Sequence, residues 1–263
     1  MTAAPEAADL LRRFGGLERL YGVAGAQRIR AAHVAVIGIG GVGSWAAEAL
    51  ARSGVGHLTL IDMDHVAESN INRQIHALST TLGQAKVLAM AERIALINPE
   101  CRVKSIEEFV EPTNWPAIVQ APVDAVIDAC DQVRAKTAMA AWALKNRLPF
   151  ITVGAAGGKR LAYKVDVDDL AYTTHDPLLA QLRYRLRREH GAARDGKRIG
   201  VSCVFSREAV ALPHASCAVQ EEGDGTLNCH GYGSSVAVTA TFGQCAAGWI
   251  LDELVQCSTL SGT

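Results

Sequence analysis

The sequence predicts an α/β protein with a Rossmann-like, mainly parallel sheet, helices on both of its faces and a C-terminal extension of antiparallel strands and helices. Two observations carry this prediction. Residues 33–73 read as strand, glycine-rich turn, helix and second strand, and strand and helix patterns then alternate up to residue 158. Such alternation favours parallel strands joined by right-handed crossovers. Ligands of such sheets bind beyond the carboxyl ends of the strands.

The turn GIGGVG contains Gly38, Gly40, Gly41 and Gly43, between the strand HVAVI and an alanine-rich helix. Glycines let the backbone approach phosphate oxygens, and the free N–H groups at the start of the helix attract anions. The next strand, HLTLI, leads into Asp62, which is suited to accept ribose hydroxyls. These features predict an adenosine-containing ligand and leave NAD, FAD and ATP open.

The remaining elements are expected from apolar periods of 3.6 and two residues. Helices are expected at residues 83–97, 113–120, 134–145, 176–190 and 234–257, and as two short segments within 8–30, broken at Gly15-Gly16 and Tyr21-Gly22. Strands are expected at 101–109, 124–131, 149–154, 161–170, 201–206 and around Val210. We expect one domain over residues 1–263, with an N-terminal helical arm at about 1–32 and a C-terminal extension at about 159–263.

The composition argues against several classes of protein. A net charge of −1 over 263 residues carries no global signal for nucleic acid or a membrane surface. Seven cysteines without a CxxC pair argue against a disulfide framework and a four-thiolate zinc site, so we expect a reducing cytoplasm and no zinc. Residues 1–13 lack the features of a secretory signal. The uncharged run at 225–251 is rich in small residues, which favours a buried helix over a membrane span.

Three charged residues favour ATP over the other nucleotides. Arg73 follows the second strand, Lys86 lies in the first turns of the next helix, and Asp131 is expected at the end of the fourth strand. Two cations and a carboxylate near a glycine turn suit a triphosphate with magnesium. Asp128 competes with Asp131 for the metal, but we expect Asp128 to face the core. An NAD-linked oxidoreductase, supported by the glycine motif and Asp62, remains the distant alternative.

Several phrases resemble a known superfamily. GIGGVGSWAAEALARSG, LIDMD, NINRQIHAL, GQAKVLAMAERIALINPE and DACD resemble the adenylyltransferases related to ubiquitin-activating enzymes, the ThiF, MoeB and HesA superfamily. RFGGLERLYG, DPLLAQLRYRLR, VSCVFSRE and VTATFG resemble the branch of that superfamily that cyclises threonylcarbamoyladenosine in tRNA. The resemblance covers nearly the whole chain. The core motifs are specific to the superfamily, and the C-terminal half assigns the branch.

The resemblance implies a set of nucleotide-binding and catalytic residues. The nucleotide-binding set is Gly38, Gly40, Gly41 and Gly43 for the phosphates, Asp62 for the ribose, and Asn70, Arg73, Gln74 and Lys86 for the phosphates again. The catalytic set is Arg73 and Lys86, which would stabilise charge as pyrophosphate leaves, and Asp131, which would bind Mg²⁺.

The reaction implied is adenylation of the threonine carboxylate on a modified adenosine beside the tRNA anticodon. A nitrogen of the same modification then closes a hydantoin ring with loss of AMP, and because this group is tethered, no protein nucleophile is needed. The resemblance also implies a homodimer and an arginine from the partner subunit that corresponds to Arg13 or Arg19. It allows a monovalent cation near the site and a cysteine desulfurase or sulfur-acceptor protein as a partner.

Three alternatives remain open. Activation of the C-terminus of a ubiquitin-like sulfur-carrier protein is the second hypothesis, although many such enzymes hold zinc through two CxxC pairs that this chain lacks. The arginine-rich helix is either a solvated face or a tRNA-binding surface made by Arg183, Arg185, Arg187 and Arg188. Cys229, next to His230 in a glycine-rich loop, is either a reactive thiol or an incidental one.

Overall fold

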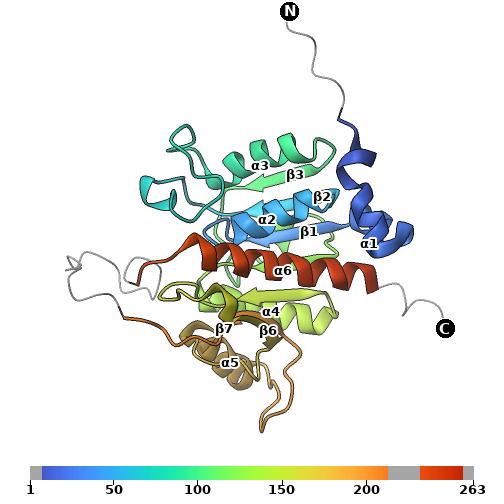
Figure 1. Cartoon of the computed structure of the whole chain (residues 1–263). Coiled ribbons are helices and arrows are strands. Elements are labelled where there is room, and N and C mark those ends of the chain that lie inside the picture. The colour runs from blue at the N-terminus through green and yellow to red at the C-terminus, as the bar shows by residue number, and fades with distance from the viewer. Residues whose placement is uncertain (1–7, 213–231, 257–263) are drawn as a thin grey trace, which may run out of the picture.

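The structure, a computed structural model, describes residues 8–212 and 232–256. Within these residues the strands form a seven-stranded sheet in the order β3-β2-β1-β4-β5-β7-β6, with helices on both faces (Figure 1). All neighbouring strands are parallel except β6 and β7, which are antiparallel. The predicted Rossmann-like sheet with an antiparallel C-terminal extension is confirmed.

The strand order predicts a crevice at the centre of the sheet. The strands are β1 His33–Ile37, β2 His57–Ile61, β3 Arg102–Ile106, β4 Ala125–Asp128, β5 Phe150–Val153, β6 Val165–Asp169 and β7 Ser202–Ser206. Ile37 pairs with Ile61 on one side and with Asp128 on the other, so β1, β2 and β4 end together. The chain order reverses at β1, and ligands of open α/β sheets bind at such a switch point.

Helices cover both faces because successive residues of each strand point to opposite sides. The helices are α1 Leu10–Ala31, α2 Gly43–Arg52, α3 Lys86–Ile97, α4 Val133–Asn146, α5 Pro177–Glu189 and α6 Val236–Gln256. Val34 and Val36 of β1 join the core beneath α1, α2, α3 and α6. Ala35 and Ile37 join the core beneath α4 and α5. In Figure 1, α6 lies along α2, and α1 packs at the C-terminal end of α6.

Three sequence expectations are wrong. The break expected at Gly15-Gly16 does not occur, since glycine can adopt helical dihedral angles and the segment stays helical there. The break expected at Tyr21-Gly22 is confirmed, because the helix kinks where Gly22 takes φ 73°. Residues 113–120 form turns and the short 3₁₀ helix η2 Ala117–Val119, because Pro116 has no N–H to donate within an α-helix. The region around Val210 is not a strand: Ala211 donates one backbone bond to Gly158, but no ladder forms.

Other boundaries differ by a few residues. The strand expected to run to residue 109 ends at Ile106, and the one expected to run to Asp131 ends at Asp128. There the Cys130 N–H donates to the Asp128 carboxylate at 3.2 Å, which turns the chain away from the sheet. The uncharged run ends in the buried helix α6. Among the helices of residues 8–212 and 232–256, none has both the length and the hydrophobicity of a membrane span.

His76 belongs to the loop that connects β2 to α3. Its side chain is buried, and neither ring nitrogen has a hydrogen-bond partner among the described residues. Burial, followed by the positive charges of Lys86 and Arg93, lowers the pKa of His76 from 6.5 to about 4. The ring is therefore neutral in the folded protein at pH 7.

We expect the folded state to lose stability between pH 7 and pH 5 through His76. In this window the unfolded histidine binds a proton and the folded one does not, so the free energy of unfolding decreases as the pH falls. The expected loss is about 2 kcal/mol, because about 1.5 pH units lie between the unfolded pKa of 6.5 and pH 5, at about 1.36 kcal/mol per unit.

Urea titrations of wild type and His76→Gln at pH 5 and pH 7 measure this loss. The variant should show the smaller difference between the two pH values. His65→Gln, which changes an exposed histidine of the same loop, is the matched control. Equal pH dependence in wild type and His76→Gln would contradict the assignment.

Candidate functional site

The glycine turn is shaped by two close contacts of its own backbone. Gly38 has φ 83°, and its N–H donates to Ile61 O at 2.8 Å. A Cβ on Gly38 would lie 2.8 Å from Ala129 O, and a Cβ on Gly43 would overlap the carbonyl oxygen of Gly38. Any larger residue at either position would therefore push β1, α2 and the end of β4 apart.

Gly40 and Gly41 have a different reason to be glycines. A Cβ on Gly40 would have Gln74 Nε2 as its nearest neighbour, at 3.9 Å. A Cβ on Gly41 would make ordinary contacts with Thr239 and Arg73, at 3.4 and 3.5 Å. Protein packing thus tolerates side chains at both positions. Their absence leaves backbone uncovered at the start of α2, where a phosphate group can approach the N–H groups.

Asp62 follows the end of β2 and closes one side of this turn. Its Oδ2 accepts from Ile39 N–H at 2.6 Å, and its Oδ1 accepts from Asp64 N–H at 2.8 Å. Burial raises the pKa of Asp62, while Lys86 and these two N–H groups lower it. The residue remains partly accessible, and each carboxylate oxygen keeps a second lone pair. The geometry thus leaves Asp62 able to accept ribose hydroxyls.

Arg73 and Gln74 lie against the glycine turn. The aliphatic part of Arg73 lies beside Gly41, where a Cβ would be 3.5 Å from it, and Trp45 Nε1 donates to the Arg73 carbonyl at 2.9 Å. Gln74 is buried, and its Oε1 has no hydrogen-bond partner among the described residues. A buried carbonyl without a donor is costly, so a ligand or water donor at this point would stabilise the site.

Asn70 supports the same loop from beneath. It ends η1 Glu68–Asn70, is buried, and accepts from Ala67 N–H at 3.1 Å through Oδ1. The structure therefore brings Arg73 and Gln74 to the turn and gives the Asn70 oxygen a bond within the loop.

Lys86 is the first residue of α3, and its side chain is buried rather than exposed on the helix surface. Its Nζ donates to Asp64 Oδ2 at 2.6 Å, while the Asp64 side chain is 57% exposed. Sequence reasoning missed Asp64 as the partner of Lys86. The signal was present, because the LIDMD phrase places a second aspartate two residues after Asp62.

Asp131 lies in the loop between β4 and α4 rather than at the strand end. Desolvation, Asp64 and Asp128 raise the pKa of Asp131, and Lys136 lowers it. Asp128 is fully buried beside Lys136, as expected for a residue facing the core. Among the described residues, no three His, Cys, Asp or Glu side chains converge on a metal site. Asp131 alone still fits Mg²⁺, which is often bound by one or two carboxylates and substrate phosphates.

The four arginines of α5 divide into two pairs. Arg183 Nη1 donates to Leu170 O at 2.9 Å and to Thr173 O at 3.0 Å, and Arg187 Nε donates to Ala193 O at 3.0 Å. These two side chains therefore stabilise the fold through hydrogen bonds to the backbone. Arg185 and Arg188 instead pair with Glu189 on the helix surface.

Three other expected residues lie away from this crevice or outside the description. Arg13 donates to the carbonyls of Leu96 and Ile97 at the end of α3, and Arg19 is exposed on α1. Cys229 lies outside the described residues. The described cysteines Cys101, Cys130, Cys203 and Cys245 are free thiols.

Comparisons with known proteins agree with this geometry. The ThiF family model matches residues 15–261. The tRNA threonylcarbamoyladenosine dehydratase of Escherichia coli K12 is 47% identical over 251 residues, 93% of this chain and 94% of that protein. The crystal structure of the E. coli tRNA N6-threonylcarbamoyladenosine dehydratase in complex with ATP is 44% identical, has a TM-score of 0.86, and is matched over 98% of this chain and 100% of that one.

Carrier-protein enzymes are more distant. The E. coli molybdopterin-synthase adenylyltransferase is 32% identical over 132 residues, which is 50% of this chain. The full-length match to the first two proteins, together with the family model, identifies the chain: it belongs to the ThiF family and, within it, to the tRNA threonylcarbamoyladenosine dehydratases.

Proposed function

We propose that this protein uses ATP to dehydrate threonylcarbamoyladenosine in tRNA to its cyclic hydantoin form. The observation that carries the proposal is the uncovered turn at Gly40 and Gly41 beside the unpartnered oxygen of Gln74, in a chain 44% identical to a dehydratase solved with ATP. An ATP molecule in this crevice would place its ribose at Asp62 and its phosphates at the start of α2.

The first step is adenylation of the threonine carboxylate. A carboxylate is a poor electrophile because its leaving group would be oxide, and transfer to the α-phosphorus of ATP replaces oxide with AMP. Arg73 and Lys86 would stabilise the negative charge that develops as pyrophosphate leaves. Asp131, with phosphate oxygens, would hold a magnesium ion that neutralises the same charge.

The second step is ring closure within the substrate. A nitrogen of the carbamoyl group attacks the activated carbonyl and AMP departs, so a hydantoin forms with no covalent bond to the protein. Because the nucleophile is tethered, effective concentration supplies much of the rate. The residues 154–158 follow β5, next to β4, and we assign this glycine-rich segment to the acyl side of the crevice.

The alternatives have less support. Activation of a ubiquitin-like sulfur carrier rests on a likeness to about half of the chain. A hydride-transfer function rests on the glycine turn and Asp62 alone. Pyrophosphate exchange that requires a small Gly-Gly-ended protein would favour the first, and tight binding of NAD in place of ATP would favour the second.

A homodimer is part of the proposal. Large apolar side chains are exposed on α1 and α3, among them Leu11, Leu20 and Leu96, which are 74%, 71% and 82% exposed. A second copy of the chain would bury them. We also place the protein in the cytoplasm, since its described cysteines are free thiols and its substrate is tRNA.

The proposed tRNA-binding surface includes only two of the four arginines of α5. Arg185 and Arg188 lie on the outer face of α5, and Arg188 stacks over the exposed ring of Tyr184 at 5.2 Å. A cation and an aromatic ring side by side suit phosphates and an unstacked base. The exposed side chains of Arg194, Lys197 and Arg198 in the loop that follows extend the positive charge.

We expect Arg73→Ala and Lys86→Ala each to lower kcat for hydantoin formation by about 100-fold, since each removes a charge that stabilises the departing pyrophosphate. The assay incubates protein, magnesium ATP and tRNA bearing threonylcarbamoyladenosine, with the product followed by mass spectrometry. Arg102→Ala, an exposed arginine at the start of β3, is the control. Failure of wild type to form any hydantoin would refute the proposed function, and normal rates in both variants would refute the two roles.

Charge reversal on the outer face of α5 tests the tRNA surface. Arg185→Glu with Arg188→Glu should weaken tRNA binding and reduce its salt dependence, because fewer phosphate contacts release fewer counterions. Filter binding across a salt series measures both, and ATP affinity should stay unchanged. Arg102→Glu, a charge reversal on β3 that shifts the net charge by half as much, is the control for an effect of reversed charge outside α5. Unchanged tRNA affinity in the double variant would place the RNA elsewhere.

A further inference from the structure

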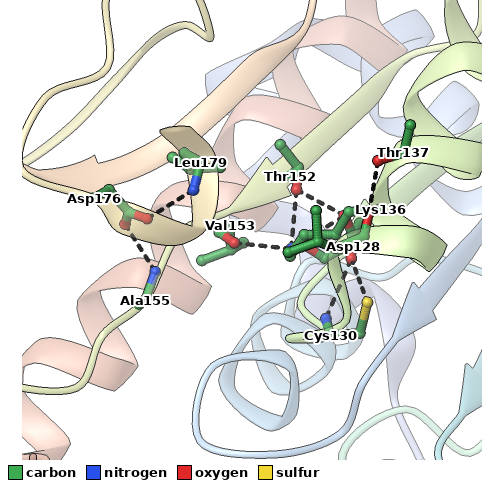
Figure 2. A network of polar contacts seen from close by, with 10 residues as sticks. Asp128, Cys130, Lys136, Thr137, Thr152, Val153, Ala155, Asp176 and Leu179 are labelled. Atoms are coloured by element: carbon green, nitrogen blue, oxygen red, sulfur yellow. Dashed lines mark hydrogen bonds and ion pairs between the residues drawn. The ribbon is translucent and has the colours of Figure 1, made fainter. Parts of the chain in front are cut away.

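A buried ion pair lies where β4 and β5 end (Figure 2). Asp128 and Lys136 are both fully buried, and Lys136 Nζ lies 3.1 Å from Asp128 Oδ2. Thr152 joins them, because its hydroxyl donates to Asp128 Oδ2 at 2.7 Å and accepts from Lys136 Nζ at 3.0 Å. Lys136 also donates to Val153 O at 2.9 Å.

The pair is poorly explained by stability alone. Desolvating two charges offsets most of their attraction, and apolar residues of similar volume often fold as well or better. The neighbouring positions Val126 and Ile127 of β4, and Ile151 of β5, are apolar. At these positions the same strands are therefore packed by apolar side chains without any ion pair. Within β4 the charge lies only at the last residue, Asp128, and Lys136 contacts it from α4.

Asp128 binds the segment that leads to Asp131. Asp128 Oδ1 accepts from Cys130 N–H at 3.2 Å and from Cys130 Sγ at 3.1 Å. The same segment packs against the glycine turn, since a Cβ on Gly38 would lie 2.9 Å from Cys130 N. The path of the chain from β4 to Asp131 is therefore set by Asp128 and by the phosphate-binding turn together.

Lys136 binds the end of β5. Lys136 binds the carbonyl of Val153, and two residues later the N–H of Ala155 donates to Asp176 Oδ2 at 2.8 Å. Asp176 also caps α5 by accepting from Leu179 N–H at 2.9 Å (Figure 2). The bonds thus run from the loop with Asp131, across β4 and β5, to residues 154–158.

We propose that Asp128, Lys136 and Thr152 are positioning residues that hold Asp131 and residues 154–158 in fixed relative places across the ends of β4 and β5. This inference rests on the proposed function, in which Asp131 binds Mg²⁺ and residues 154–158 face the acyl substrate. These three residues, called the triad below, contact neither ATP nor the tRNA. It keeps the metal-bound phosphates and the threonine carboxylate in reactive geometry, and partners of this kind typically change metal affinity or activity 10–100-fold.

Two variants separate positioning from stability. Thr152→Val keeps the shape of the side chain and removes the hydroxyl that joins both charges. Asp128→Asn with Lys136→Met removes both charges at once, so no unpaired buried charge remains. Thr59→Val is the matched control, since Thr59 is a fully buried threonine of the same sheet, bonded to His33 Nε2 at 2.8 Å, in the middle of β2.

The experiment measures ATP binding by calorimetry without tRNA, over a series of Mg²⁺ concentrations and in EDTA, together with the midpoint of urea unfolding and the single-turnover rate of hydantoin formation. In Thr152→Val and in the double variant, we expect the Mg²⁺ concentration for half-maximal ATP binding to rise about tenfold and the rate to fall about tenfold or more. ATP affinity in EDTA should change by less than about twofold. Thr59→Val should match wild type in its Mg²⁺ dependence, its rate and its ATP affinity in EDTA.

The outcomes are distinct. Wild-type Mg²⁺ dependence and rate in a folded Thr152→Val would overturn the proposal and leave the triad a structural feature. Equal losses with Mg²⁺ and in EDTA would also overturn it, because the whole crevice, rather than Asp131, would then have moved. Wild-type protein that binds no ATP in a Mg²⁺-dependent way would refute the proposed function itself. Should the double variant not fold, Thr152→Val decides.

Discussion

The site depends on one steric constraint, the close approach of the α2 start to the end of β1. Gly43 lies so near the carbonyl of Gly38 that no side chain fits between them, and Gly38 in turn touches Ala129 and Cys130 beyond β4. This contact brings the N-terminus of α2 to the switch point of the sheet, where the positive end of the helix can attract an anion. Asp62, Arg73 and Gln74 then have a common surface to lie against.

Around that surface the charges are largely compensated by other protein groups. Lys86 is buried but bonded to exposed Asp64, and Asp62 accepts two backbone N–H groups. A buried cation with one exposed partner is well placed to exchange that partner for a phosphate, since both supply anionic oxygen. Asp128 and Lys136 lie one layer deeper and compensate each other. These charged groups therefore leave no isolated ion in the core.

Local patterns predicted the elements that surround the glycine turn. The strand, glycine turn and strand of residues 33–62 lie as expected, because alternating apolar residues and glycines act over a few positions. Prediction failed where the outcome depends on neighbours. Gly15-Gly16 stays helical in a segment anchored by buried Phe14, and the residues near Val210 find no strand to pair with. Pro116 argued against a helix at 113–120. The prediction gave more weight to the apolar residues around it and was therefore wrong.

By itself the sequence determined the fold class, the glycine turn between β1 and α2 and, through its motifs, the family to which the chain belongs. Only the tertiary structure decided what each charged residue contacts. Arg183 and Arg187 are turned inward to backbone carbonyls, while Arg185 and Arg188 stay on the surface of the same helix. Lys86 is buried against Asp64, and Asp128 is joined to Lys136 and Thr152 of two other elements. The physical reason is that hydrogen bonds and desolvation depend on groups 8 to 24 residues apart in the chain, and folding alone brings those groups together.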